Sequence, residues 1–305
     1  MSTKPTILLV HGGWQSPSVW TFVMPLLEKA GYSVYPVLLK SPGMAPAAPD
    51  FSCDVDAIRS SVEAVLECGK DAVVVMHSYA AIAGCEALKV FHDEMKGCAH
   101  GGDGGDGWAA SDSSAVKGDL DTKHAHRGDG DSDAVVPAKY ISRRGRIVHL
   151  AFIVGMVMPV GKGLWTPERT EWDGFELKPP LTNREIQDEL IRILDGPRRF
   201  YNDLPASAQK YWSAKLKLQP RPVFFSPLTY PAYRHYPCSY LMCKLDGAVP
   251  FKVQTRMTFG AGIARERIEV LEDAGHSPMI SRPAKVAEFI RRAAGEGVAV
   301  AESRL

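Results

Sequence analysis

Short apolar runs recur along the chain and alternate with longer stretches in which apolar residues return every three or four positions. Several of the short runs are apolar at both alternating positions, a pattern that favours strands covered by helices on both faces. Strands of this kind pair in parallel sheets. The predicted strands are Thr6–Val10, Tyr32–Leu39, Ala72–Met76, Arg146–Ile153, Cys238–Cys243 and Arg267–Leu271.

Helical periodicity lies between these runs. Residues Asp56–Cys68 place Ile58 and Val62 on one side of a helix, and a second helix is predicted over Ile82–Met95. A third helix is predicted over Pro283–Ala294, where the proline suits the first helical turn. Strand and helix in alternation predict an α/β fold with a doubly wound, mostly parallel sheet.

Two segments interrupt this alternation. Residues His100–Asp133 are dominated by Gly, Asp and Ser, so they cannot bury enough apolar surface to offset the cost of ordering. We predict a flexible surface insertion there, at about 99–135. The second segment, Met158–Tyr236, is rich in proline and aromatic residues, with helical patterns at Asn183–Leu194 and Ala206–Leu216. It is predicted to form an inserted helical lid.

The expected organisation follows from these boundaries. Residues 1–157 form the first part of an α/β core, 158–236 form the lid, and 237–305 complete the core. At 305 residues, of which 45% are hydrophobic, the chain can bury a sizeable core. With 36 basic and 35 acidic residues it has no charge excess that would attract a polyanion, so a nucleic-acid partner is not expected.

The compartment is inferred from apolar runs and cysteines. The longest apolar run, Leu150–Val160, has 11 residues, too few to span a membrane, and is predicted to be a buried strand. The run near the N-terminus has only four residues, too few for the core of a signal peptide. The six cysteines show no CxxC pairing, so we expect reduced core residues in a cytoplasmic monomer or homodimer. They are Cys53, Cys68, Cys85, Cys98, Cys238 and Cys243.

A serine directly follows one of the predicted strands, in the sequence VVVMHSYAA. Ser78 would lie at the carboxyl end of the sheet, where clefts form in open α/β folds. A sharp turn would expose its Oγ and aim the N–H of Tyr79 at a developing oxyanion. The usual pattern of such an elbow is GxSxG, and here Met76 and Ala80 replace both glycines. A serine that merely caps the following helix is the alternative.

Three further motifs follow other strands. HGGW, at His11–Trp14, follows the first strand, and its glycines allow backbone N–H groups to approach a substrate oxygen, although a plain tight turn would also use them. Asp246 follows the fifth predicted strand, and His276 follows the last, 30 residues later. Ser, Asp and His in this order, each beyond the end of a strand, match a nucleophile, its orienting acid and its base.

On the motifs HGGW, MHSYA and GHSPMISRP, the chain resembles the α/β-hydrolase superfamily, and within it the branch of small esterases and hydroxynitrile-lyase-like enzymes. The resemblance covers nearly the whole chain except the Gly/Asp-rich insertion. It implies Ser78 as nucleophile, His276 as base and Asp246 as orienting acid. It also implies that the backbone N–H groups of Gly13 and Tyr79 stabilise the oxyanion.

The same resemblance bears on the reaction. Hydroxynitrile lyases resemble one another in carrying a lysine directly after the catalytic histidine and a threonine after the first histidine of the oxyanion loop. Here these positions hold Ser277 and Gly12, which argues against cyanohydrin cleavage.

Other polar residues compete for roles in the site. His77 would point away from the Ser78 Oγ and is expected to be structural, and His11 is expected to anchor the oxyanion loop. Asp203 in the predicted lid and Asp273 are alternatives to Asp246 as the acid.

Metal binding is not expected. The opening of DGDSD, Asp129–Asp133, has the spacing of a calcium loop, but Ala134 and Tyr140 stand where that loop needs Gly and Glu. The histidines of His124–His126 have no further ligands at metal spacing.

The aromatic residues of the lid are predicted to line an apolar pocket above the serine, together with Gly12 and Trp14. We therefore expect cofactor-independent hydrolysis of a small apolar or aromatic ester or lactone through an acyl-enzyme. Two alternatives stay open: a lyase or cyclase of a polyketide-like metabolite, and a ligand-binding protein that has lost turnover. The lid aromatics are Trp165, Trp172, Phe200, Tyr201, Trp212, Phe224 and Phe225.

Overall fold

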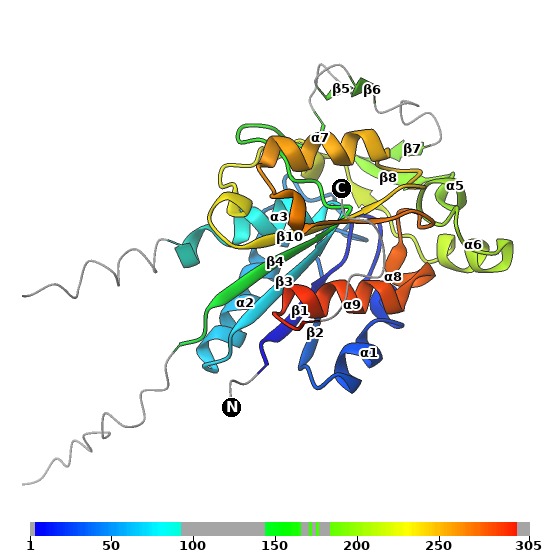
Figure 1. Ribbon diagram of the computed structural model, residues 1–305. Coiled ribbons are helices and arrows are strands. Elements are labelled where there is room, and N and C mark those ends of the chain that lie inside the picture. The colour runs from blue at the N-terminus through cyan, green and yellow to red at the C-terminus, as the bar shows by residue number, and fades with distance from the viewer. Residues whose placement is uncertain (1–3, 93–143, 166–170, 173–174, 177–183, 298–305) are drawn as a thin grey trace, which may run out of the picture.

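A parallel sheet of six strands forms the centre of the protein (Figure 1). The computed structural model describes residues 4–92, 144–165, 171–172, 175–176 and 184–297. The strand order is β11-β10-β4-β3-β1-β2, and all neighbours are parallel. The strands are β1 (Thr6–Val10), β2 (Val34–Val37), β3 (Ala72–His77), β4 (Ile147–Ile153), β10 (Cys238–Cys243) and β11 (Ile268–Leu271). The predicted α/β fold with its parallel sheet is confirmed.

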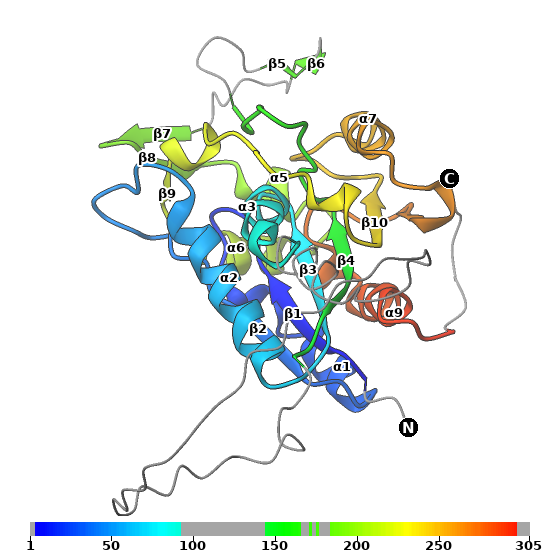
Figure 2. The ribbon, with the colours of Figure 1, turned by 90° about the vertical axis from the view of Figure 1, so that its left-hand side faces the viewer.

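Helices cover both faces of this sheet. Figures 1 and 2 show α2 and α3 on one face and α1 and α9 on the other. Every residue of β1 and β3 is buried as a result, which explains why these strands are apolar at both alternating positions. The helices are α1 (Met24–Lys29), α2 (Ser52–Glu67), α3 (Ala80–Ala87), α7 (Phe251–Ala261), α8 (Pro278–Ser281) and α9 (Pro283–Ala293).

The strand order fixes where loops from distant parts of the chain meet. From β1 the chain crosses to β2 at one edge, and from β3 it crosses to β4 on the other side of the sheet. Such a reversal is the place where open α/β sheets bind ligands, beyond the carboxyl ends of the two strands. Val10 pairs with Met76 at those ends, so the loop that begins at His11 lies beside Ser78.

Residues 158–236, called the 158–236 segment below, lie between β4 and β10, and none of the strands described within them joins the central sheet. Figures 1 and 2 show its strands β7 and β8 at the end toward which the central strands point. Its elements are β5 (Glu171–Trp172), β6 (Phe175–Glu176), β7 (Arg184–Gln187), β8 (Leu190–Ile193), α5 (Gly196–Phe200), α6 (Ala206–Ser213) and β9 (Gln219–Pro220). Short 3-10 helices occur at η1 (Pro17–Trp20), η3 (Pro222–Phe224), η4 (Ala232–Arg234) and η5 (Arg265–Arg267).

The helix predicted over Asn183–Leu194 is wrong. Within this range, Arg184–Ile193 form the hairpin of β7 and β8, in which Gln187 pairs with Leu190 across a two-residue turn. The turn residues Asp188 and Glu189 have φ angles of 52° and 62°, so both are left-handed, as in a type I′ hairpin turn. On β8, Ile191 is fully buried, whereas Leu194, just beyond the end of this strand, is 58% exposed.

Two smaller predictions also need correction. The apolar run Leu150–Val160 is not one strand, because β4 ends at Ile153 and Val154 has a φ of 42°. Cys68 is exposed rather than in the core, whereas Cys85, Cys238 and Cys243 are buried. All five cysteines within the described residues are free.

Some predictions fall outside the part of the chain that the structure describes. They concern the insertion at about 99–135, Cys98, and the two candidate metal motifs within the insertion. Among the helices that are described, none is long and apolar enough to cross a membrane.

Candidate active site

Ser78, His276 and Asp246 form a continuous line of hydrogen bonds. The His276 Nε2 lies 3.0 Å from the Ser78 Oγ, and its Nδ1 lies 2.8 Å from the Asp246 Oδ2. Each residue comes from a loop at the carboxyl end of a strand: Ser78 follows β3, Asp246 follows β10 and His276 follows β11. The structure thus brings together three residues separated by as many as 198 positions in the chain.

Ser78 has an unusual backbone conformation. Its φ of 53° is left-handed, a region that non-glycine residues occupy rarely and at a cost of roughly 1–3 kcal/mol. The conformation is held from both sides, because the Ser78 N–H donates to the Ile153 carbonyl at 3.1 Å and the Met156 N–H donates to the Ser78 carbonyl at 3.0 Å. Ser78 therefore sits on a sharp turn between β3 and α3 rather than simply capping the helix.

The two residues that replace the usual elbow glycines are accommodated in the packing. Met76 is fully buried, and its Sδ occupies the space where a side chain at Gly84 of α3 would lie. Ala80, at the first position of α3, is also fully buried. A glycine on the helix thus provides the room that a glycine on the strand would otherwise provide, and the turn stays tight.

Asp246 is held by more than the histidine. Its Oδ1 accepts hydrogen bonds from the N–H groups of Ala248 and Val249, both at 2.7 Å, and its Oδ2 also lies 3.4 Å from the Gln254 Nε2. With both backbone donors on Oδ1, Oδ2 is left to accept the Nδ1–H of His276. That bond fixes the imidazole tautomer with its Nε2 facing Ser78.

The competing acids have other partners. The Asp203 Oδ2 accepts the N–H of Gly275 at 2.7 Å, so this side chain supports the loop that carries His276. The Asp273 Oδ2 lies 2.8 Å from the Arg282 Nε. Both ring nitrogens of His276 are already bonded to Asp246 and Ser78, which leaves no place for either competitor.

The glycines after β1 pack tightly against the serine turn. A Cβ atom added at Gly12 would lie 2.8 Å from the His77 Nδ1 and 3.1 Å from the Ser78 Cβ. One added at Gly13 would lie 3.6 Å from the Tyr79 Cβ. Within the described residues, the N–H groups of Gly13 and Tyr79 donate to no other residue. Two backbone donors are thus available close to Ser78.

The histidines near the serine are structural in this geometry. The His11 Nδ1 lies 2.9 Å from the Gly12 carbonyl, its Nε2 accepts the Leu39 N–H at 3.2 Å, and burial lowers its pKa to about 4. The His77 Nε2 lies 2.8 Å from the His276 carbonyl, and burial lowers the pKa of His77 well below its usual value. Both rings are therefore neutral at pH 7, and each anchors a loop of the site.

Aromatic side chains join the 158–236 segment to the site. Trp14 stacks on Phe224 with ring centroids 4.8 Å apart and lies 5.9 Å from the Phe200 ring. Trp165 packs on Phe224 at 4.5 Å, and Phe200 lies 5.3 Å from the His276 ring. Four aromatic residues thus form one cluster beside the histidine.

The remaining aromatic residues that were predicted to line the pocket lie outside this cluster of four or pack against its members. Tyr201 is fully buried and packs against Phe200 at 6.2 Å, whereas Trp212 packs against Phe22 at 6.3 Å. Phe225 lies 6.0 Å from Trp165, and Trp172 belongs to the short strand β5. Ser277, the residue after the histidine, accepts a hydrogen bond from the Gln15 Nε2 at 3.2 Å.

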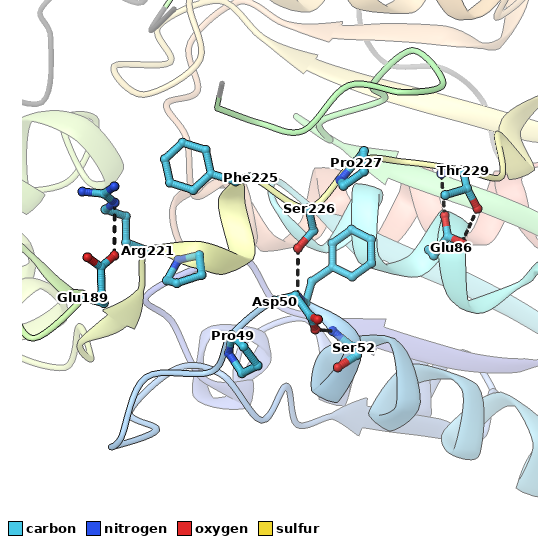
Figure 3. Close-up of a pocket in the computed structure, with 12 residues that line it drawn as sticks. Pro49, Asp50, Ser52, Glu86, Glu189, Arg221, Phe225, Ser226, Pro227 and Thr229 are labelled. Atoms are coloured by element: carbon cyan, nitrogen blue, oxygen red, sulfur yellow. Dashed lines mark hydrogen bonds and ion pairs between the residues drawn. The ribbon is translucent and has the colours of Figure 1, made fainter. Parts of the chain in front are cut away.

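A separate open groove of about 550 Å³ lies between the start of α2 and the 158–236 segment (Figure 3). It contains none of Ser78, Asp246 and His276. Its polar groups bond to one another: Glu86 accepts hydrogen bonds from Thr229, and Arg221 lies 3.3 Å from Glu189. Its lining is Pro49, Asp50, Phe51, Ser52, Glu86, Glu189, Arg221, Pro222, Phe225, Ser226, Pro227 and Thr229.

Comparison with known proteins agrees with this fold. Alpha/beta hydrolase nvfD of Aspergillus novofumigatus is 27% identical over 301 residues, spanning 97% of this chain and 99% of its own. Polyneuridine aldehyde esterase superposes with a TM-score of 0.63 at 16% identity, covering 95% of this chain and 98% of its own. A pyrethroid hydrolase from Sphingobium faniae superposes with a TM-score of 0.62 at 16% identity, covering 96% and 98%.

The family follows from a match to most of the chain. The family model described as "Alpha/beta hydrolase family" matches residues 7–289, so this protein belongs to the alpha/beta hydrolase family.

Proposed function

We propose that the protein is a cofactor-independent serine hydrolase that cleaves a small ester or lactone. The observation that carries this proposal is the line from Asp246 through His276 to Ser78, with distances of 2.8 Å and 3.0 Å. His276 takes the hydroxyl proton as the Ser78 Oγ attacks the substrate carbonyl, and it then gives that proton to the leaving alcohol. Water attacks the resulting acyl-enzyme by the same route in reverse and releases the acid.

The tetrahedral intermediate carries a negative oxygen that needs donors. The N–H groups of Gly13 and Tyr79 are the proposed donors, since both lie beside Ser78 and neither donates to another described residue. Removing one such donor costs about 10²–10³ in kcat in serine hydrolases. The rigid turn at Ser78 supports this role, because donors that are already oriented need no rearrangement as charge develops.

The proposed substrate is apolar or aromatic on at least one side of the ester. The cluster of Trp14, Trp165, Phe200 and Phe224 supports this choice, because aromatic walls suit an apolar group better than a sugar or a phosphate. The similar proteins above include an esterase and a pyrethroid hydrolase by name. In this proposal residues 158–236 act as the lid, between core parts at 1–157 and 237–305.

The geometry favours neither alternative reading of the sequence. A threonine at Gly12, as in hydroxynitrile lyases, would place its Cβ 2.8 Å from the His77 Nδ1. The reading as a ligand-binding protein rested on the missing elbow glycines, and the packing of Met76 over Gly84 accommodates that change. No observation singles out a cyclase.

Steady-state kinetics with p-nitrophenyl esters of short aliphatic and aromatic acids tests the proposal. We expect turnover that is lost in Ser78→Ala and kept in Ser61→Ala, where the changed serine is on α2 and bonds to the Ala57 carbonyl. Full activity of Ser78→Ala, or no hydrolysis of any ester by the wild-type protein, would refute it.

A further inference from the structure

A fully buried carboxylate bonds to the side chain of Tyr79, whose backbone N–H is one of the proposed oxyanion donors. Asp54, in the first turn of α2, accepts four hydrogen bonds from N–H and O–H groups, in addition to a long one from the Cys53 thiol at 4.0 Å. Its Oδ1 accepts the N–H groups of Lys40 and Ser41, both at 2.8 Å. Its Oδ2 accepts the Ser41 hydroxyl at 2.6 Å and the Tyr79 hydroxyl at 2.8 Å. A buried charge is tolerated only with such partners, so these four groups are fixed relative to one another.

The network continues into the 158–236 segment. The Gln219 Nε2, on β9, donates to the Ser41 hydroxyl at 2.6 Å, and its Oε1 accepts the backbone N–H of Trp14 at 2.9 Å. Gln219 is fully buried. A single chain of hydrogen bonds therefore runs from Tyr79 through Asp54, Ser41 and Gln219 to Trp14.

Trp14 is held in a strained conformation at the far end of this chain. Its φ is 60°, an outlier for a bulky residue that costs roughly 1–3 kcal/mol and persists only when the surroundings enforce it. Besides the bond to Gln219, the Trp14 carbonyl accepts the Lys217 N–H at 2.7 Å, and its indole N–H donates to the Ile191 carbonyl at 3.2 Å. All three polar groups of Trp14 bond to the 158–236 segment.

Both ends of the chain reach the proposed oxyanion donors. Tyr79 carries one donor N–H on its own backbone. The Trp14 N–H belongs to the peptide bond between Gly13 and Trp14, so its hydrogen bond holds the residue that carries the other donor N–H. We propose that Asp54 and Gln219 are positioning residues, joined by Ser41, that set the spacing of the Gly13 and Tyr79 N–H groups. This inference rests on the proposed function, because those N–H groups matter only if an oxyanion forms at Ser78.

The consequence concerns the transition state and not substrate binding. A substrate carbonyl gains little from the two donors before attack, whereas the oxyanion needs both at hydrogen-bonding distance. A misplacement of about 1 Å can cost about 100-fold in rate. Loss of the network should therefore lower kcat and leave KM nearly unchanged.

The test uses Gln219→Met and Tyr79→Phe, singly and together, in the full chain. Each removes polar atoms of the network and keeps most of the side-chain volume. We expect kcat for a p-nitrophenyl ester to fall about 10- to 100-fold in each, with KM within about 2-fold. The inhibition constant of a trifluoromethyl ketone, which forms an oxyanion on the serine, should rise by the factor by which kcat/KM falls. The kcat of the double variant should be no lower than that of the more affected single variant, because both changes break the same series of hydrogen bonds.

Tyr233→Phe is the matched control. It removes a buried tyrosine hydroxyl that bonds to the Met158 carbonyl at 2.8 Å, outside the network, and should leave kcat unchanged. Wild-type kcat in both test variants, or a loss confined to the melting temperature, would overturn the positioning role while leaving the proposed function standing. Multiplying effects in the double variant would also overturn it. A wild-type protein without esterase activity would instead refute the proposed function. If Gln219→Met does not fold, Tyr79→Phe with the ketone decides alone.

Discussion

The side chain of Met76 on β3 and the bare Cα of Gly84 on α3 occupy one shared space. The Met76 Sδ fills the position where a side chain at Gly84 would begin, and both residues are in the buried interface between strand and helix. This pair explains how the serine turn stays sharp without a glycine at position 76. The two positions are therefore expected to be coupled, so that a change at one requires a change at the other.

Gly84→Ala should destabilise the protein by about 1–3 kcal/mol, because the added methyl group overpacks a close contact with Met76. Met76→Ala alone should also destabilise it, since a buried cavity replaces the thioether. The double variant should recover part of the loss. Urea unfolding of all four proteins measures this coupling. Additive losses would show that the two residues do not share the space.

Asp246→Asn should lower kcat by roughly three to four orders of magnitude and leave the fold intact. The backbone N–H groups of Ala248 and Val249 require an acceptor at the Oδ1 position, so the asparagine must turn its amide nitrogen toward His276. The imidazole would then hold its proton on Nε2, where it cannot accept from Ser78. Ester hydrolysis under saturating substrate measures the effect.

Asp203→Asn and Asp273→Asn are the matched comparisons for that change. Asp273 bonds to Arg282 at the surface, so its variant should retain near wild-type kcat. Asp203 supports the Gly275 N–H, so its variant should lose less activity than Asp246→Asn. A larger loss at either position than at Asp246 would mean that the orienting acid has been misassigned.

The sheet follows closely from the apolar pattern, and the reasons are visible in particular strands. Residues Thr6–Val10 and Cys238–Cys243 form strands with the predicted limits, because strands buried on both faces are short runs that polar residues or prolines end. The hairpin at Arg184–Ile193 escaped prediction because its apolar residues also fit helical spacing. Its turn, Asp188 and Glu189, has no Gly or Asn to mark the left-handed conformation.

The candidate site was predictable only in part. Ser78, Asp246 and His276 stand out because each follows a strand. By contrast, the bond between Trp14 and Gln219 joins residues 205 positions apart and leaves no local pattern. Asp54 did leave a signal. It lies four residues before Ile58 and eight before Val62, on the buried face of α2, where a charged residue needs buried partners.

Acid should destabilise the fold through its buried histidines. Burial lowers the pKa of His149 on β4 to about 4, whereas an unfolded histidine titrates near ~6.5. The unfolded chain therefore binds the proton more readily. The stability that neutral His149 contributes is complete above pH 6.5, is lost as the pH falls, and levels off below about pH 4.

His149→Gln should remove this part of the pH dependence. Glutamine can keep the hydrogen bond to the Ser239 hydroxyl, which lies 2.9 Å from the His149 Nε2. Between pH 7 and pH 5 the free energy of unfolding of the variant should fall by about 2 kcal/mol less than that of the wild type. Denaturant titrations at the two pH values give this difference. An equal fall in both proteins would contradict the assignment of His149 as a buried neutral group.

The proposed function depends on Ser78 acting as a nucleophile that His276 activates. Its most direct test is to treat the protein with a fluorophosphonate probe and locate the adduct by mass spectrometry of the digested chain. We expect one adduct, on the peptide that contains Ser78, with labelling abolished in Ser78→Ala and strongly slowed in His276→Ala. An adduct on another serine, or undiminished labelling of Ser78→Ala, would contradict it.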